Sequence, residues 1–224
     1  MDADKEKVIE SFDNISHIQN KLWNHNNHYY QRVLNMMKIK QGHILDIGCG
    51  DGDFLSLAIK ENHSCIGVDF SPGMISKAQQ NSELNDCELI CGDIYDVLPC
   101  FLDDTFDAVF SFATMHHLDY EKLLPNLSRI MKKGSFFCIV DILKSSSLID
   151  YLYNAVAIIP NIIKKRILYR DAWKEKEAKV LWDEHGKLDR YLTFLELKVI
   201  MDKLGYHYKL KRLLYFRYML VVYF

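Results

Sequence analysis

The stretch with the clearest chemical meaning is an apolar run that ends in three glycines, each separated by one residue. Asp46 lies within this run, and Gly48, Gly50 and Gly52 follow it. Glycine lets the backbone turn sharply and approach a ligand closely. The third glycine comes two residues after the second, whereas the dinucleotide fingerprint G-x-G-x-x-G requires three. The pattern therefore predicts a small-molecule site and disfavours a nicotinamide cofactor.

Two further carboxylates follow apolar runs downstream. Asp69 ends the run that begins at Ile66, about 20 residues after the first glycine, where an acidic side chain can accept hydrogen bonds from two ribose hydroxyls. Asp93 ends the next run. An Asp that follows a strand is, taken alone, usually a turn residue. Ligands of open α/β sheets bind outside the carboxyl ends of the strands, so three such signals together predict one crevice.

Taken together, these residues resemble the class I methyltransferases that use S-adenosylmethionine. The resemblance extends from about His43 to the C-terminal hairpin and includes Phe106–Phe112 and Met115–Leu118. It is greatest to the small-molecule branch, the type 11 methyltransferases that include ubiquinone and menaquinone biosynthesis enzymes. The family usually has Lys-Pro-Gly-Gly where Lys132–Ser135 stands here, which makes that turn less typical. The resemblance implies S-adenosylmethionine as the cofactor.

The resemblance also implies roles for individual residues at the cofactor. Asp69 would bind the ribose, and Asp93 would accept a hydrogen bond from the adenine amino group. The residues that would cradle the methionine part are Asp46, Gly48, Cys49, Gly50 and Gly52. The residues that would flank the adenine ring are Phe70, Met74 and Ile94, and Phe112 is also expected to line the cofactor site.

Two adjacent histidines, His116 and His117, are the candidate catalytic residues. They follow the fourth predicted strand, and a neutral imidazole near pH 7 suits a general base. One of them could instead fill space below the following helix while the other binds a backbone carbonyl. These two histidines, like His25 and His28, could in principle bind a metal, but no nearby carboxylate or cysteine completes a ligand set. We therefore predict no metal.

The methyl acceptor would be a small molecule. Its candidate contacts come from one segment before the first predicted strand and from another after the fifth. The segment 23–30 resembles the helix that closes over the cofactor in many relatives, and its acceptor-site candidates are His25, His28, Tyr29 and Tyr30. His25 could equally lie on a solvated face, and Tyr30 could pack against the core.

Downstream, Tyr153 and Trp173 belong to an aromatic segment that suggests a lid over a partly apolar acceptor. That segment also contains Tyr151, Tyr169, Trp182 and a basic group of Lys164, Lys165, Arg166 and Arg170. The basic group could dock an acidic substrate or an anionic lipid surface, although such charges are usually only solvated.

Short β-type runs alternate with helical stretches over the first two thirds of the chain. This order predicts an α/β, Rossmann-like sheet of seven mostly parallel strands with a C-terminal antiparallel hairpin. We predict helices over 52–62, from the N-cap Ser71, over 119–133 with closure at Gly134, and from Thr193 to Gly205. Residues 1–224 are expected to form one domain, with a helical cover over 1–40 and an inserted helical cap over 145–190.

Composition narrows the function classes. The chain has 224 residues and a net charge of -2, so no global basic field indicates nucleic acid as a partner. The six cysteines form no Cys-x-x-Cys pair, which favours reduced, mostly buried thiols. The longest apolar stretch is shorter than the ~20 residues that a spanning helix needs, so we expect no integral membrane association. The charged N-terminus resembles no secretory signal, and we expect a cytoplasmic protein.

The sequence therefore predicts a methyltransferase that moves a methyl group from S-adenosylmethionine to an oxygen, nitrogen, carbon or sulfur atom of a small, partly apolar metabolite. Two alternatives stay open. The chain could bind the cofactor without catalysis, as a sensor or partner subunit, because a cofactor motif alone does not establish catalysis. A nicotinamide oxidoreductase would share Asp69 but would require the other glycine spacing.

Overall fold

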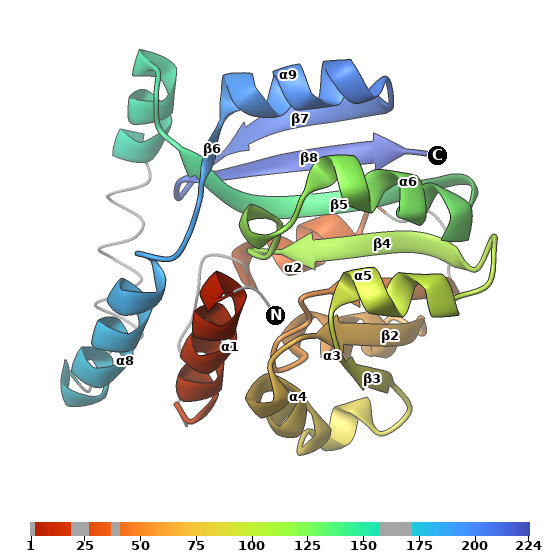
Figure 1. Cartoon of the computed structure of the whole chain (residues 1–224), viewed down its shortest axis with the longest axis horizontal. Coiled ribbons are helices and arrows are strands. Elements are labelled where there is room, and N and C mark those ends of the chain that lie inside the picture. The colour runs from red at the N-terminus through yellow and green to blue at the C-terminus, as the bar shows by residue number, and fades with distance from the viewer. Residues whose placement is uncertain (1–2, 19–26, 37–40, 157–171) are drawn as a thin grey trace.

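The structure is a computed structural model that describes residues 3–18, 27–36, 41–156 and 172–224. Its centre is a twisted sheet in the order β3-β2-β1-β4-β5-β8-β7 (Figure 1). The strands are β1 (His43–Ile47), β2 (Ser64–Asp69), β3 (Glu88–Cys91), β4 (Phe106–Phe112), β5 (Met131–Lys144), β7 (His207–Leu213) and β8 (Arg217–Tyr223). The first five are parallel, whereas β8 is antiparallel to both β5 and β7. The predicted fold is confirmed, with one addition: a two-residue strand, β6 (Leu192–Thr193), pairs with the end of β5.

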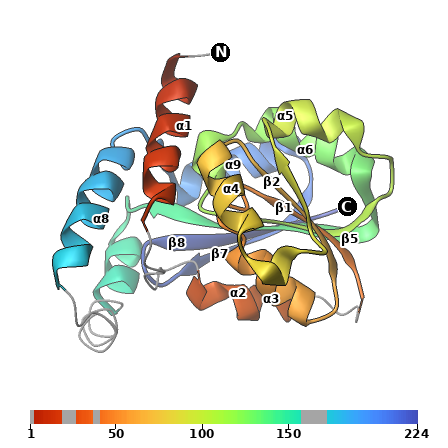
Figure 2. The same cartoon turned by 90° about the horizontal axis from the view of Figure 1, so that it is seen from below.

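Helices cover both faces of the sheet (Figure 2). On one face lie α2 (Asn27–Leu34) and α3 (Asp53–Lys60), and on the other lie α5 (Ile94–Val97), α6 (Tyr120–Ile130) and α9 (Phe194–Leu204). Each face has its own buried apolar cluster, one built around Phe54 and Phe110 and the other around Phe106 and Phe137. Burial of apolar side chains on both faces is what stabilises a parallel sheet, and it explains the continuous apolar runs of its strands.

Helices α1 (Ala3–Ser16) and α8 (Ala172–His185) lie outside this three-layer arrangement. Helix α1 packs against α4 (Pro72–Gln79) and α8. Both views show α1 and α8 side by side near the edge of the sheet where the parallel strands end. This placement brings the N-terminus and the predicted cap region together over the candidate site.

Most predicted helix boundaries are close to those observed. Ser71 caps α4, with Pro72 at its first position, and the Thr193 capping box and Gly205 C-cap of α9 are both present. The prediction for 119–133 was wrong at its C-terminal end. Helix α6 ends at Ile130, and Gly134, with a φ of 83°, lies inside β5. The helix stops because Met131 already pairs with Phe106 of β4.

The described part of the predicted cap is mainly helical. Residues 148–156 are helical, α8 follows, and 157–171 lie outside the described residues together with Tyr169 and the basic group. The division into one domain with a cover and a cap stays a prediction. All six cysteines are free: Cys49, Cys65 and Cys138 are buried, Cys87 is half-buried, and Cys91 and Cys100 are exposed. Among the described residues, no helix is long and apolar enough to cross a membrane.

Candidate cofactor cleft and histidine cluster

The glycine-rich turn after β1 packs tightly against the end of β4. Gly48 has a φ of 73°, and a Cβ built on it would lie 2.0 Å from Thr114 Oγ1. The N–H groups of Gly48 and Cys49 donate to the carbonyl of Val68, which ties the turn to β2. A Cβ on Gly50, in contrast, would meet no described atom within 4 Å. The turn therefore needs glycine at position 48 for packing, and its backbone at Gly50 borders open space.

Asp69 joins this turn to the start of α4. Its Oδ2 accepts from the N–H of Gly50 at 2.9 Å, and its Oδ1 accepts from the N–H of Ser71 at 2.9 Å. Burial raises the pKa of Asp69 to about 6, although these two hydrogen bonds oppose the shift. Each carboxylate oxygen can accept a second hydrogen bond, so the side chain is held where two hydroxyls could reach it.

Asp46 is the clearest sign of a missing partner in this cleft. Its side chain is buried, and Oδ1 has no hydrogen-bond donor among the described residues. Burial, and next the nearby Asp69, raise its pKa well above the usual value. An unpaired buried acceptor is costly unless a ligand supplies the donor. The ammonium and hydroxyl groups of S-adenosylmethionine are such donors, so Asp46 and Asp69 fit this cofactor.

Asp93 caps α5 at the same edge of the sheet. Its Oδ1 accepts from the N–H of Tyr95 at 3.0 Å, and its Oδ2 forms an ion pair with Lys5 of α1. Asp13, also of α1, accepts from Ser71 Oγ at 2.6 Å and from the N–H of Gly73 at 2.9 Å. Helix α1 of the predicted N-terminal cover therefore contacts Asp93 and the start of α4. From the sequence, contacts with the cofactor residues were expected from the segment 23–30.

The remaining predicted cofactor residues are mostly buried around these carboxylates. The buried members are Cys49, Met74, Ile94 and Phe112, and Gly52 precedes α3 with a φ of 80°. Phe112 packs against Phe54, with ring centroids 4.7 Å apart. Phe70 is half-buried and meets Phe12 of α1 edge to face at 5.8 Å. The structure gathers these residues at one edge, and their individual roles toward the cofactor stay predictions.

The predicted acceptor residues are not brought together as a group. Tyr29 is buried and its hydroxyl donates to the carbonyl of Leu214, whereas His28 is exposed beside Tyr215. Tyr30 packs against Phe112, with centroids 4.6 Å apart, as its alternative role predicted. Burial, and then Asp46, raise the pKa of the Tyr30 phenol, so its ring lies near the cleft. Tyr153 is exposed on the helix 148–156, and His25 and the side chain of Trp173 lie outside the described residues.

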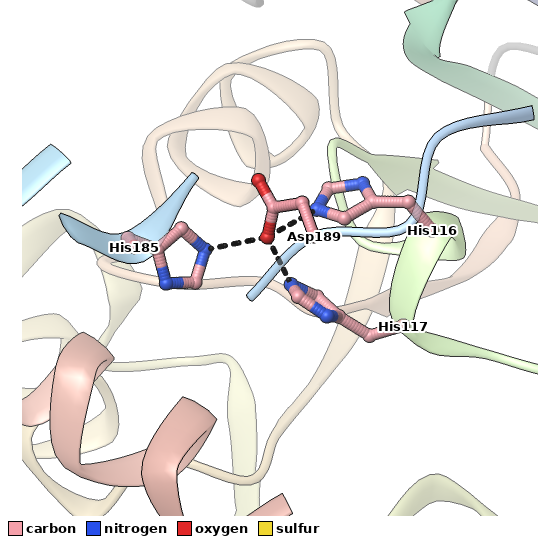
Figure 3. Close-up of side chains that lie close together, drawn as sticks. All are labelled: His116, His117, His185 and Asp189. Carbon is pink, nitrogen blue, oxygen red and sulfur yellow. Dashed lines mark ion pairs between the residues drawn. The ribbon is translucent and has the colours of Figure 1, made fainter. Parts of the chain in front are cut away.

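His116 and His117 form a separate cluster with His185 and Asp189 (Figure 3). The two neighbouring histidines follow β4 in a short 3-10 turn, His185 ends α8, and Asp189 follows in the next loop. Asp189 Oδ1 lies 3.5 Å from His116 Nε2, 3.4 Å from His117 Nε2 and 3.4 Å from His185 Nε2. All four side chains are largely buried, from 3% exposed for Asp189 to 11% for His117.

Each imidazole of the cluster has a different electrostatic environment. Burial disfavours the charged form of His116, but Asp141, whose Oδ1 is 2.8 Å from His116 Nδ1, raises its pKa to about 9. Burial and the neighbouring His116 lower the pKa of His117 to about 4. His117 is thus a neutral imidazole at pH 7.

Three residues that contact His116 or His117 were not predicted from the sequence: Asp141, His185 and Asp189. The predicted absence of a metal rested on the lack of a nearby carboxylate, and that reason was wrong because the fold supplies Asp189. Two local signals were present in the sequence. Asp141 is the only acidic residue of β5, and His185 and Asp189 are spaced four residues apart at a helix end. Neither signal shows by itself that these residues contact His116 and His117 in the folded protein.

Comparison with known proteins bears on the identity of the fold and of the glycine-rich turn. Residues 45–139 match the family described as a methyltransferase domain. A demethylmenaquinone methyltransferase of Staphylococcus carnosus is 34% identical over 143 residues, which cover 59% of this chain and 58% of that protein. Residues 45–139 therefore carry a methyltransferase domain, and the fold is that of S-adenosylmethionine-dependent methyltransferases of class I.

A second curated relative and two solved structures are also similar to this chain. The demethylmenaquinone methyltransferase of Bacillus licheniformis is 32% identical over 139 residues, covering 58% of this chain and 56% of the relative. A putative S-adenosylmethionine-dependent methyltransferase of Methanococcus maripaludis has the same fold, with a TM-score of 0.60, 20% identity, and coverage of 100% of this chain and 94% of that one. A chain of the Haloferax volcanii complex between the Trm112 activator and a putative methyltransferase gives a TM-score of 0.68 at 16% identity, with 96% of each chain covered.

These comparisons support the cofactor more directly than the acceptor. The matched family region contains the glycine-rich turn, Asp69 and Asp93, which are the residues predicted to bind the cofactor. A methyltransferase domain implies S-adenosylmethionine as the cofactor, which disfavours the nicotinamide alternative. The chain spans less than two thirds of the length of the curated relatives that it matches.

Proposed function

We propose that this protein transfers a methyl group from S-adenosylmethionine to a small, partly apolar acceptor of the quinol type. The observation that carries the proposal is the buried, unpaired Oδ1 of Asp46 beside the ordered carboxylate of Asp69. In this arrangement Asp46 would accept from the methionine ammonium group, Asp69 would hold the ribose hydroxyls, and Asp93 would accept from the adenine amino group. The cofactor itself supplies a methyl group on a sulfonium, which is a good leaving group.

The work of the protein in such a reaction is alignment. Methyl transfer is an in-line displacement, so holding donor and acceptor in one geometry lowers the barrier more than any covalent participation of the protein. The tight packing at Gly48 and the two backbone hydrogen bonds to Asp69 fix the donor side before the ligand arrives. A general-base role for His116 or His117 stays a prediction, and the Nε2 atoms of both rings face Asp189.

Two observations favour an apolar acceptor. The two curated relatives named above methylate demethylmenaquinone according to their names, and residues 45–139, which match the methyltransferase family, include Asp46, Asp69 and Asp93. In addition, the helix at 148–156 turns its polar side chains inward. Asp150 binds Arg212 and Asn154 binds the N–H of Phe216, while apolar residues of the same helix are exposed. The exposed residues are Leu148, Ile149, Tyr151, Leu152, Tyr153 and Val156.

Two measurements test the proposal. Calorimetric titration with S-adenosylmethionine, S-adenosylhomocysteine and NAD should give saturable binding of the two adenosyl ligands only. Methyl-labelled cofactor should then transfer its label to a chemically reduced short-chain naphthoquinone that lacks the methyl group, with S-adenosylhomocysteine and a proton as the other products. Asp69→Ala should weaken cofactor binding about 10- to 100-fold and slow methyl transfer, whereas the exposed Asp103→Ala should leave both unchanged. Cofactor binding without transfer to the quinol would contradict the proposed reaction and would favour the non-catalytic alternative.

A further inference from the structure

The histidine cluster lacks the contacts that would normally stabilise buried polar groups. Asp189 Oδ1, His116 Nε2 and His117 Nε2 are buried, and none has a hydrogen-bond partner among the described residues. The distances of 3.4–3.5 Å from Asp189 Oδ1 to the three imidazole nitrogens exceed those of good hydrogen bonds. Three imidazoles facing one carboxylate oxygen therefore leave several buried groups unsatisfied, which is costly unless something bridges them.

A cation would satisfy all four groups at once. The four ligand atoms lie within 4.8 Å of one another. A tetrahedral site with bonds of 2.0–2.1 Å has neighbouring ligand atoms about 3.4 Å apart, which matches the three distances to Asp189 Oδ1. Figure 3 shows the three rings arranged around this oxygen from different directions.

The outer contacts of the cluster are also those of a metal site. His116 Nδ1 lies 2.8 Å from Asp141 Oδ1, and His185 Nδ1 lies 3.1 Å from Ser11 Oγ. Tyr191 donates its hydroxyl to the second oxygen of Asp189. A histidine that binds a metal through one ring nitrogen almost always bonds a carboxylate, carbonyl or hydroxyl group through the other, because this fixes the ring. Here two of the three rings are fixed in this way.

We propose that His116, His117, His185 and Asp189 bind one divalent cation of the zinc type. Imidazole nitrogens favour zinc and its transition-metal neighbours, whereas magnesium and calcium prefer sites made of oxygen atoms. Four protein ligands complete a tetrahedral zinc shell and leave no open position, as in structural sites. The cation would therefore join the end of α8 and the loop at Asp189 to the turn after β4, and hold the cap against the sheet.

The test is metal uptake by the full chain without a histidine tag. Protein stripped with chelator should take up one equivalent of Zn²⁺ after dialysis, measured by mass spectrometry of the metal content. Co²⁺ in its place should give the intense visible absorption of a tetrahedral site. Zn²⁺ should also raise the midpoint of thermal unfolding. His185→Ala and Asp189→Ala should weaken Zn²⁺ binding at least tenfold and abolish the cobalt spectrum.

Matched controls separate a specific site from loss of fold. His207→Ala removes an exposed histidine of β7 and should leave the uptake of one equivalent unchanged. Asp189→Asn keeps the size of the side chain, and normal binding of S-adenosylmethionine by this variant will establish that it is folded. Failure of the wild-type protein to retain one equivalent of Zn²⁺, or equal retention by Asp189→Asn, His185→Ala and wild type, would overturn the proposal. Both outcomes are independent of methyl transfer.

Discussion

The cofactor cleft and the histidine cluster lie at the same edge of the sheet, but their members come from very different distances along the chain. The predicted cofactor residues lie at or just after the ends of parallel strands: the turn 48–52 follows β1, Asp69 ends β2, and Asp93 lies two residues after β3. The cluster combines the turn after β4 with His185 and Asp189, and its outer contacts reach Ser11. The cofactor residues lie together because the carboxyl ends of parallel strands meet at one edge of the sheet. The histidine cluster, in contrast, forms only when α1 and α8 pack against that edge.

The two regions also differ in the charge of the ligand they would accept. The cleft contains buried carboxyls whose pKa values are raised, and Asp46 has an oxygen that needs a donor. In the cluster, burial opposes ionisation of Asp189, but contacts with His116 and Tyr191 lower its pKa, so this carboxylate stays charged among the imidazoles. The first environment suits hydroxyl and ammonium donors, and the second suits a bare cation.

The largest expected effect comes from Gly48→Ala in the cleft. The new Cβ would clash with the side chain of Thr114, 2.0 Å from its Oγ1. The φ of 73° at this position also disfavours any residue that has a Cβ. We expect a loss of about 2–4 kcal/mol of stability from overpacking and strain, and no measurable cofactor binding. Gly50→Ala is the matched control, because it has a positive φ but no clash, and should cost about 1 kcal/mol. Chemical denaturation measures both, and equal losses would contradict the packing argument.

Asp69→Ala should act on one region only. It removes a charged acceptor for the ribose and the link between Gly50 and Ser71. Loss of a hydrogen bond to a charged group costs about 1.5–3 kcal/mol, so the Kd for S-adenosylmethionine should rise about 10- to 100-fold. Calorimetry measures this change, and zinc uptake by the same variant should equal that of wild type. A loss of zinc from Asp69→Ala would show that the two regions are not independent.

Asp141→Asn is the reciprocal variant. Asp141 accepts from the N–H of His116 and contacts its ring, so the amide would orient this imidazole less well. Zinc affinity should fall about tenfold by competition with a chelator, with an unchanged Kd for the cofactor. Ser11→Ala, which removes only the contact to His185, should have a smaller effect. Stronger cofactor loss than zinc loss would reverse the assignment of Asp141 to the cluster.

Cofactor binding should also depend on pH. Because burial raises the pKa of Asp69 to about 6, its side chain gains a proton as the pH falls through that value, and it then accepts ribose hydroxyls less well. The Kd for S-adenosylmethionine should therefore rise about tenfold from pH 7 to pH 5. Calorimetry across this range should show a much weaker dependence for Asp69→Asn. An equal dependence in the variant would assign the titration to another group.

The same contrast explains how much the sequence could predict. The strands, their order and the cleft follow from local patterns, because apolar runs and glycines mark each strand end directly in the chain. The helix end at Ile130 was missed because the pairing of Met131 with Phe106 overrides the glycine signal at Gly134. The partners of His116 and His117 were missed because α8 brings them from about 70 residues away, and no local pattern encodes which helix docks where.

Helix α1 contacts both regions of the protein. Lys5 pairs with Asp93 near its start, while Ser11 and Phe12, two turns later, contact His185. Exchange of backbone amide hydrogens with deuterated solvent depends on local opening of such contacts. The first turns of α1 should therefore change their exchange rate when the cofactor competes for Asp93, and the last turns when the histidine cluster is altered. One short helix would therefore report on both sites.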